Sequence, residues 1–81
     1  MSYFVYILEC SDKTLYTGIA TDVERRLDEH NNSQKGAKYT KVRRPVELVY
    51  SEESENRSSA SKREHEIKKL SRKQKLELIN A

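Results

Sequence analysis

A carboxylate interrupts an apolar helical stripe in the second half of the chain. Residues 58–71 read as a helix whose apolar residues Ala60, Ile67 and Leu70 project onto one face. Glu64 falls within this stripe, four residues after Ala60. Charged side chains are rarely buried unless they are paired or bind a metal. Two interpretations stay open: Glu64 reaches water or a basic neighbour from the edge of the stripe, or its carboxylate is directed into a cleft.

Two tyrosines are expected close together on a β-hairpin near the start of the chain. In the expected register Tyr6 lies opposite Gly18, and Tyr16 lies diagonally from Tyr6 on the same face. The two hydroxyl groups could then converge, and Gly18 leaves the space in front of Tyr6 unfilled. The alternative is that both rings pack against a helix with their hydroxyls in water. A one-residue slip in the pairing would break the arrangement.

The helix that follows separates two adjacent arginines. Its core stripe is Val23 and Leu27, and Arg25 points about 180° away from the centre of that stripe. Arg26 lies about 80° to one side, and His30 lies about 40° to the same side. Arg26 alternatively pairs with the acidic residue four positions earlier. His30 alternatively complements the dipole at the end of the helix.

These residue types are the ones that a metal-dependent phosphodiesterase requires. A carboxylate holds a hard divalent cation, whose other ligands are waters and a phosphate oxygen. Arginine offers a planar fork that stabilises negative charge growing on phosphate. A tyrosine can take the proton from the attacking water, although with an ordinary pKa near ~10 it needs nearby cations to do so at neutral pH.

The elements that must carry these residues predict an α+β fold. Strands are expected at residues 3–8, 14–20 and 46–50, and helices at 22–31, 58–71 and 72–79, with a turn at 11–13 and a polar, basic loop at 32–44. The order strand–strand–helix–strand–helix–helix predicts a three-stranded antiparallel sheet flanked by helices. Pro45 opens the third strand.

Helix starts are marked by residues whose side chains accept hydrogen bonds from backbone N–H groups. Thr21 or Asp22 is expected to cap the first helix, Ser54 or Ser58 the second and Ser71 the third.

Length and composition indicate one small domain, residues 1–81. A chain of 81 residues with 35% hydrophobic and 36% charged residues is polar, but its strand pattern argues against disorder. The single cysteine, Cys10, permits no internal disulfide and no multi-cysteine metal site. Neither a transmembrane segment nor a signal peptide is expected, so we interpret the chain as a cytoplasmic protein without a membrane partner.

Positive charge is concentrated after residue 30. Residues 1–30 hold three basic and six acidic side chains, whereas residues 31–81 hold thirteen and seven. The stretch 31–45 has no acidic residue, and its basic residues are Lys35, Lys38, Lys41, Arg43 and Arg44. Such a field attracts polyanions, nucleic acid above all. The alternative is a basic surface that only keeps the protein soluble.

The ordered motifs resemble the GIY-YIG nuclease superfamily, in particular its small single-domain bacterial proteins. Val5-Tyr6-Ile7 and Tyr16-Thr17-Gly18 look like the two family triplets. Residues 16–20, 22–27 and 30–31 look like the family's second strand and following helix, and residues 62–69 look like its later motif.

The resemblance implies roles for the residues singled out above. Tyr6 resembles the general base, and Tyr16 resembles a partner that orients water or phosphate. Arg26 resembles the arginine that stabilises the scissile phosphate, and His30 falls where members place a tyrosine or histidine. Glu64 resembles the single ligand of one divalent cation, Mg²⁺ or Mn²⁺.

Three positions depart from the family pattern. Val5 and Thr17 replace a glycine and an isoleucine of the triplets, and both suit a strand. Ile19 stands where some members carry a lysine, which puts one phosphate contact in doubt.

Larger relatives also attach a separate DNA-binding domain. Here either a protein partner supplies affinity, or the basic residues bind substrate weakly: Lys35, Lys38, Lys41, Arg43, Arg44, Lys68 and Lys69.

The sequence therefore predicts a metal-dependent endonuclease that cuts DNA rather than RNA, in repair or processing. No motif reads base edges, so we expect preference for structure rather than sequence. The alternative is a nucleic-acid-binding module or adaptor without turnover. A third class is a protein-interaction domain whose charges only solubilise it.

Overall fold

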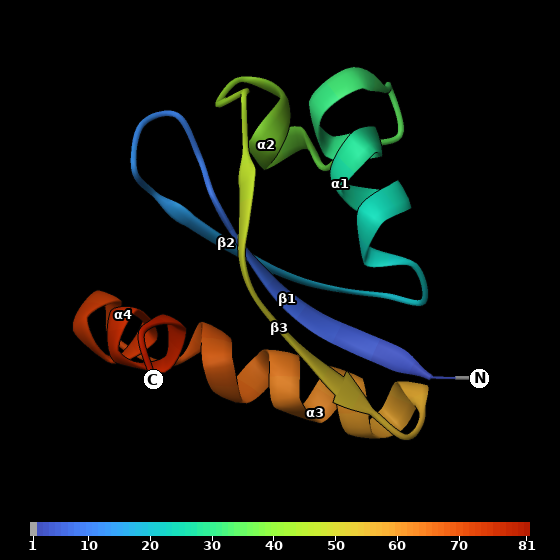
Figure 1. Cartoon of the computed structure of the whole chain (residues 1–81), viewed down its shortest axis with the longest axis vertical. Helices are drawn as coiled ribbons and strands as arrows, with labels where there is room; N and C mark the ends of the chain where they lie inside the picture. Colours follow the sequence, from blue (N-terminus) through green and yellow to red (C-terminus); the bar gives the residue numbers. More distant parts are fainter. Residues whose placement is uncertain (1) are drawn as a thin grey trace.

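A computed structural model describes residues 2–81 as a sheet with helices on both faces (Figure 1). The elements are β1 (Tyr3–Glu9), β2 (Leu15–Ala20), α1 (Val23–Asn32), α2 (Lys38–Lys41), β3 (Glu47–Ser54), α3 (Arg57–Lys68) and α4 (Arg72–Ile79). The strands lie in the order β2-β1-β3, and both pairings are antiparallel. The predicted α+β fold with a three-stranded antiparallel sheet is confirmed.

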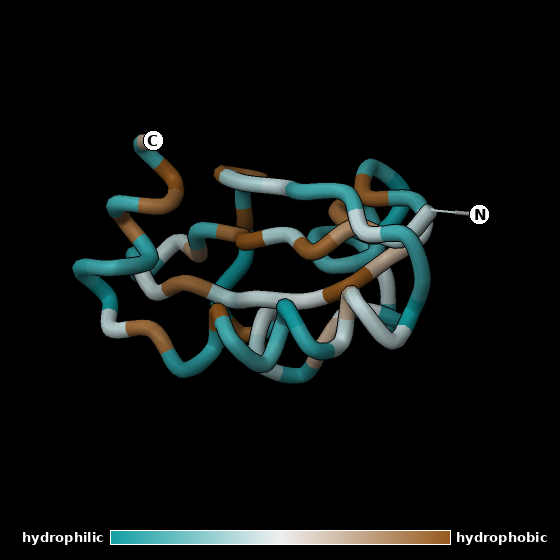
Figure 2. The backbone as a smooth tube through the Cα atoms, turned by 90° about the horizontal axis from the view of Figure 1, so that it is seen from below, coloured by the Kyte–Doolittle hydropathy of each residue, from teal (hydrophilic) through white to brown (hydrophobic). Residues whose placement is uncertain are grey.

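β1 occupies the centre of the sheet because its side chains are apolar on both faces. Val5 and Ile7 pack in a cluster with residues of α3 and α4, whereas Tyr6 and Leu8 pack in a second cluster toward α1. All four are at most 2% exposed. In Figure 2 short hydrophobic stretches alternate with hydrophilic ones along the chain, as its polar composition requires.

The β1–β2 hairpin has the predicted register. Tyr6 pairs with Gly18, and Tyr16 pairs with Leu8, so both tyrosines lie on the face toward α1. In the turn Lys13 adopts a left-handed φ of 69°, and Asp12 Oδ1 accepts a hydrogen bond from the Thr14 N–H at 3.1 Å. Local turn chemistry therefore fixes the register that brings the tyrosines together.

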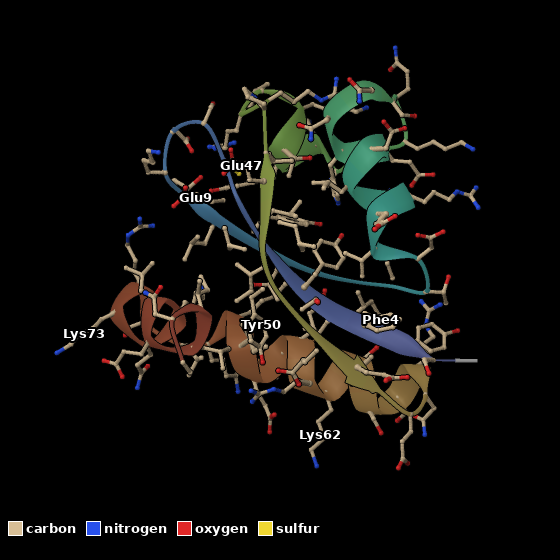
Figure 3. All side chains as sticks on the ribbon, viewed as in Figure 1. Phe4, Glu9, Glu47, Tyr50, Lys62 and Lys73 are labelled. Atoms are coloured by element: carbon tan, nitrogen blue, oxygen red, sulfur yellow. The ribbon has the colours of Figure 1, made fainter. Side chains whose placement is uncertain are left out.

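The third strand is longer than predicted. β3 runs to Ser54, four residues past the expected end, and its pairing with β1 continues to Tyr3 opposite Ser54. The last four residues of β3 are polar, so the sequence did not indicate that the strand continues through them. On the α3 side Glu52 accepts hydrogen bonds from the Tyr50 hydroxyl at 2.6 Å and from Arg63 Nε at 3.0 Å, so a charged residue is accommodated there. Figure 3 shows Tyr50 between β3 and α3.

Three local predictions were wrong. The predicted helix 58–71 ends at Lys68, so Leu70, expected in its apolar stripe, lies beyond the helix. The predicted loop 32–44 contains a short helix, α2, which has no side-chain cap and no apolar stripe to reveal it. α3 begins after Asn56, whose Oδ1 accepts from the Ser59 N–H at 2.9 Å, so neither Ser54 nor Ser58 is its cap. The caps of α1 by Asp22 and of α4 by Ser71 are as predicted.

Among residues 2–81 no helix has both the length and the apolar character needed to cross a membrane.

Candidate active site

His30 is the centre of a buried hydrogen-bond network that links α1, β1 and α2. The His30 side chain is 0% exposed, and its Nε2 lies 2.8 Å from Tyr6 Oη. Its Nδ1 lies 2.9 Å from Thr40 Oγ1 and accepts from the Ala37 N–H at 3.3 Å. A backbone amide can only donate, so Nδ1 carries the lone pair and Nε2–H donates to Tyr6. His30 thus does more than complement the dipole of α1.

Burial shifts the pKa values of His30 and Tyr6, the partners of this hydrogen bond, in opposite directions. Burial, followed by the positive charge of Arg26, lowers the pKa of His30 from 6.5 to about 4. Burial raises the pKa of Tyr6 from 10.0 to about 12; electrostatic interactions with Tyr16 and Glu64 add to this, whereas Arg26 opposes it. Both side chains are therefore neutral at neutral pH.

The two tyrosines converge on His30. The rings of Tyr16 and His30 lie edge to face with centroids 5.3 Å apart, and those of Tyr6 and His30 do so at 5.9 Å. A Cβ atom at position 18 would lie 2.5 Å from Tyr6 Oη, so Gly18 gives the Tyr6 hydroxyl its room. The space predicted in front of Tyr6 is thus taken up by the phenol itself.

Arg26 is fixed at the edge of the covered face, as its position on the helix predicted. Its Nη1 donates to Glu29 Oε1 at 3.0 Å and to the Lys35 carbonyl at 2.8 Å. The acidic partner of Arg26 is therefore Glu29 rather than Asp22, whose side chain caps α1. The Arg26 side chain is 29% exposed, against 71% for Arg25, so the predicted contrast between the two arginines is present.

A polar cleft of about 260 Å³ runs beside Arg26, between the end of β2 and the first turns of α1. Its lining includes Ile19, Asp22, Arg25 and Glu29. Arg25 lies 3.5 Å from the same Glu29 carboxylate that holds Arg26. The cleft thus gives solvent access to the Arg26 guanidinium.

Glu64 has the environment described by the first of the two interpretations offered by the sequence. Ala60 and Ile67, its neighbours in the stripe, are fully buried, while Glu64 is 23% exposed and its Oε2 lies 3.4 Å from Lys68 Nζ. It therefore lies at the edge of the stripe with a basic neighbour. Its negative charge nevertheless contributes to the raised pKa of Tyr6, although α3 packs on the other face of the sheet.

The available side chains suit a hard cation held by one carboxylate better than a metal ion enclosed by several protein ligands. Within residues 2–81 no three His, Cys, Asp or Glu side chains gather closely enough to hold a metal ion together. One carboxylate with access to solvent is what Mg²⁺ or Mn²⁺ needs when waters and phosphate supply the remaining ligands. Glu64 fits that description, with Lys68 as the group that a cation would displace.

The basic residues named from the sequence divide into two groups. Arg44 donates to the carbonyls of His30 and Ser33, each at 2.6 Å, and Arg43 binds Asp12 at 3.0 Å. These two arginines have internal structural partners, and Lys68 pairs with Glu64. The side chains of Lys35, Lys38 and Lys69 are exposed, and that of Lys41 is half-buried.

Sequence reasoning missed the contribution of α2 to the site. Thr40 is fully buried against His30, and the Tyr39 ring stacks on Tyr16 with centroids 5.9 Å apart. The one available signal was an aromatic residue within an otherwise basic, polar segment. A hydroxyl that satisfies a buried histidine leaves no periodic pattern in the sequence.

Known proteins resemble this chain over nearly all of its length. The profile of the GIY-YIG catalytic domain matches residues 2–77. The chain is 58% identical to a UPF0213 protein of Desulfotalea psychrophila over 80 residues, covering 99% of this chain and 73% of the relative. It is 62% identical to a UPF0213 protein of Staphylococcus aureus over 78 residues, covering 96% and 94%.

Two solution structures are also similar. The UPF0213 protein of Bacillus halodurans is 46% identical with a TM-score of 0.62, and a protein of E. faecalis is 48% identical with a TM-score of 0.67. In each case the match covers 99% of this chain and 84% of the other. Because the domain profile spans nearly all of the sequence, the chain belongs to the GIY-YIG family, a nuclease-type family.

Proposed function

We propose that the protein is a metal-dependent endonuclease that hydrolyses phosphodiester bonds in DNA, preferring structure to sequence. We further propose that it works in the cytoplasm, in repair or processing, where a protein partner could add affinity. The observation that carries the proposal is the convergence of Tyr6 and Tyr16 on buried His30, with Arg26 on the same helix as His30. Membership of a nuclease-type family supports this reaction class.

Tyr6 is the proposed base. In its ionised form the phenolate oxygen takes a proton from water, whose oxygen then forms a bond to phosphorus. The P–O bond to the leaving sugar oxygen breaks, and that oxygen takes up a proton from solvent. Because the pKa of Tyr6 is about 12, the phenolate is scarce at neutral pH. The N–H of His30 and the charge of Arg26 stabilise it once formed.

Arg26 is the proposed stabiliser of the phosphate. Its Nη1 is held by Glu29 and by the Lys35 carbonyl, which fixes the plane of the guanidinium. The guanidinium has further N–H groups, and these can donate to phosphate oxygens as charge develops on them. Fixing the group beforehand reduces its reorganisation during the reaction.

Glu64 would hold the cation, Mg²⁺ or Mn²⁺. When bound there, such an ion polarises a phosphate oxygen and neutralises charge on it. The chain's own contribution is a carboxylate on a well-packed helix, fixed between buried Ala60 and Ile67.

The test is a cleavage assay with matched pairs of variants. Labelled duplex, flap, junction and single-stranded DNA, with RNA counterparts, are incubated with Mg²⁺, Mn²⁺ or EDTA. Glu64→Gln and Arg26→Gln should each lower the cleavage rate by about 100-fold or more, because each removes charge at the reacting phosphate. Glu66→Gln, on the exposed side of α3, and Arg72→Gln, at the start of α4, are the controls and should cut like wild type. Wild-type rates for Glu64→Gln would refute the metal assignment.

The second candidate is a nucleic-acid-binding module without turnover. The raised pKa of Tyr6 and the exposed lysines of the 31–45 stretch favour it. Salt-sensitive binding to these substrates, with no cleavage in Mn²⁺ by wild type, would establish this alternative.

A further inference from the structure

The Tyr16 ring is held by aromatic contacts. Within residues 2–81 no side-chain hydrogen bond fixes its hydroxyl, and the side chain is half-buried. Its ring meets His30 edge to face at 5.3 Å and stacks on Tyr39 at 5.9 Å with an interplanar angle of 26°. The direction of the Tyr16 hydroxyl therefore depends on these two neighbouring rings.

Tyr39 is in turn held by Arg43. The guanidinium carbon lies 3.9 Å from the centre of the Tyr39 ring, and Nη1 donates to the Tyr39 carbonyl at 2.9 Å. Arg43 Nε also donates to Asp12 Oδ2 at 3.0 Å, in the turn between β1 and β2. One arginine thus ties α2 to the hairpin that carries Tyr16.

α2 itself is anchored to the site through His30. Thr40 is fully buried with its Oγ1 2.9 Å from His30 Nδ1, and the Ala37 N–H donates to the same nitrogen. The helix is only four residues long and has no side-chain cap, so these contacts, rather than helix propensity, determine where it lies. Tyr39 is consequently fixed relative to both His30 and Tyr16.

We propose that Tyr39, clamped by Arg43, is a positioning residue that sets the orientation of Tyr16 for the reaction. This inference rests on the proposed nuclease function and on the role that the family resemblance implies for the Tyr16 hydroxyl, which is to orient water or phosphate. An exposed aromatic residue among lysines also suits base stacking, but here a guanidinium already lies over the ring. The contacts of Tyr39 therefore point inward to Tyr16.

The experiment separates orientation from binding. Tyr39→Leu should lower the single-turnover cleavage rate about tenfold, because small errors in the position of a reacting group are costly. The Kd for the same flap or junction DNA, measured in EDTA, should not change. Tyr39→Phe keeps the ring and should restore the wild-type rate. The control is Val42→Ala, because Val42 lies at the end of α2 and is 80% exposed. This variant should match wild type in both measurements.

A second measurement does not depend on turnover. In NMR spectra of protein with labelled tyrosine and histidine, wild type and Tyr39→Phe should show contacts between the rings of Tyr16 and His30. Tyr39→Leu should weaken them while keeping a folded spectrum. Unchanged ring contacts in Tyr39→Leu would overturn the positioning role even if the protein never cuts DNA. A weaker Kd with an unchanged rate would also overturn it, in favour of base contact.

Discussion

Burial explains why His30 and Tyr6, which share one hydrogen bond, both remain neutral. Removal from water disfavours the charged form of each residue, so the pKa of the histidine falls and that of the tyrosine rises. The network around His30 satisfies both of its ring nitrogens. A neutral, fully buried histidine is therefore compatible with a stable fold at neutral pH. In acid, protonation of His30 favours the unfolded chain.

Stability should fall as the pH decreases from 6.5 toward 4. The unfolded chain binds a proton on His30 near its ordinary pKa of 6.5, whereas the folded protein does so only near 4. The free energy of unfolding should drop by about 2 kcal/mol between pH 7 and pH 5 from this residue alone. Urea unfolding of wild type and His30→Gln at both pH values measures the difference. The variant should lose most of this pH dependence, although it is less stable overall.

The exposed His65 provides the control for this experiment. His65→Gln should keep the wild-type dependence of stability on pH. An equal drop in wild type and His30→Gln between pH 7 and pH 5 would show that another group is responsible.

The periodicity of the sequence predicted which face of a strand or helix each site residue occupies, but it did not predict the hydrogen-bond partners of these residues. Strand alternation was enough to place Tyr6 and Tyr16 on one face, and helical spacing was enough to distinguish Arg26 from Arg25. The partners of His30 could not be predicted, because Thr40 and Ala37 lie in a segment with no apolar pattern.

At the scale of elements, α1 depends on a residue from a distant segment. Its last turn ends at Asn32, and Arg44 donates to the carbonyls of Glu29, His30 and Ser33. A guanidinium at a helix C-terminus satisfies carbonyl groups and opposes the helix dipole. Arg44 thereby holds the end of α1 that carries His30, a role that its place in a basic stretch did not indicate.

Arg44→Gln should lower the free energy of unfolding by about 1–3 kcal/mol, because it removes charge-assisted hydrogen bonds to partly buried carbonyls. Arg44→Lys should recover only part of this, since an ammonium group lacks the planar fork. Lys41→Gln, in the same basic stretch, should stay within about 0.5 kcal/mol of wild type. Urea unfolding measures all three variants. A loss for Arg44→Gln no larger than that for Lys41→Gln would contradict the capping role.

Of the three helix starts in residues 2–81 that have a side-chain cap, the sequence predicted two and missed Asn56, which caps α3 in the same way. Asp22 and Ser71 both precede their helices, as the sequence indicated. The end of β3 was not predictable, because Glu52 is accommodated by Tyr50 and Arg63, and these partners come together only in the folded sheet. The short helix α2 owes its place to tertiary contacts and had no local signature.

For the whole molecule, the distribution of exposed positive charge should decide how nucleic acid is bound. The protein measures 30 × 29 × 18 Å and carries a net charge of +3, so a general attraction for DNA would be weak. Two exposed lysines lie at or beside α2: Lys35 lies between α1 and α2, and Lys38 is the first residue of α2, the segment that contacts His30. Figure 3 shows Lys62 and Lys73 directed outward from α3 and α4, away from that segment.

A double substitution at Lys35 and Lys38 should therefore weaken DNA binding and its salt dependence. Each phosphate contact contributes about 0.9 to the slope of log K against log salt concentration, so replacing both lysines by glutamine should reduce the slope by about 2. Binding is measured in EDTA by fluorescence anisotropy between 50 and 200 mM salt, roughly the range over which counterion release dominates. The matched control replaces Lys62 and Lys73 by glutamine, which changes the net charge equally but on the far side of the sheet. Equal slopes for the two double variants would mean that DNA responds only to net charge, and that the α2 segment does not face the substrate.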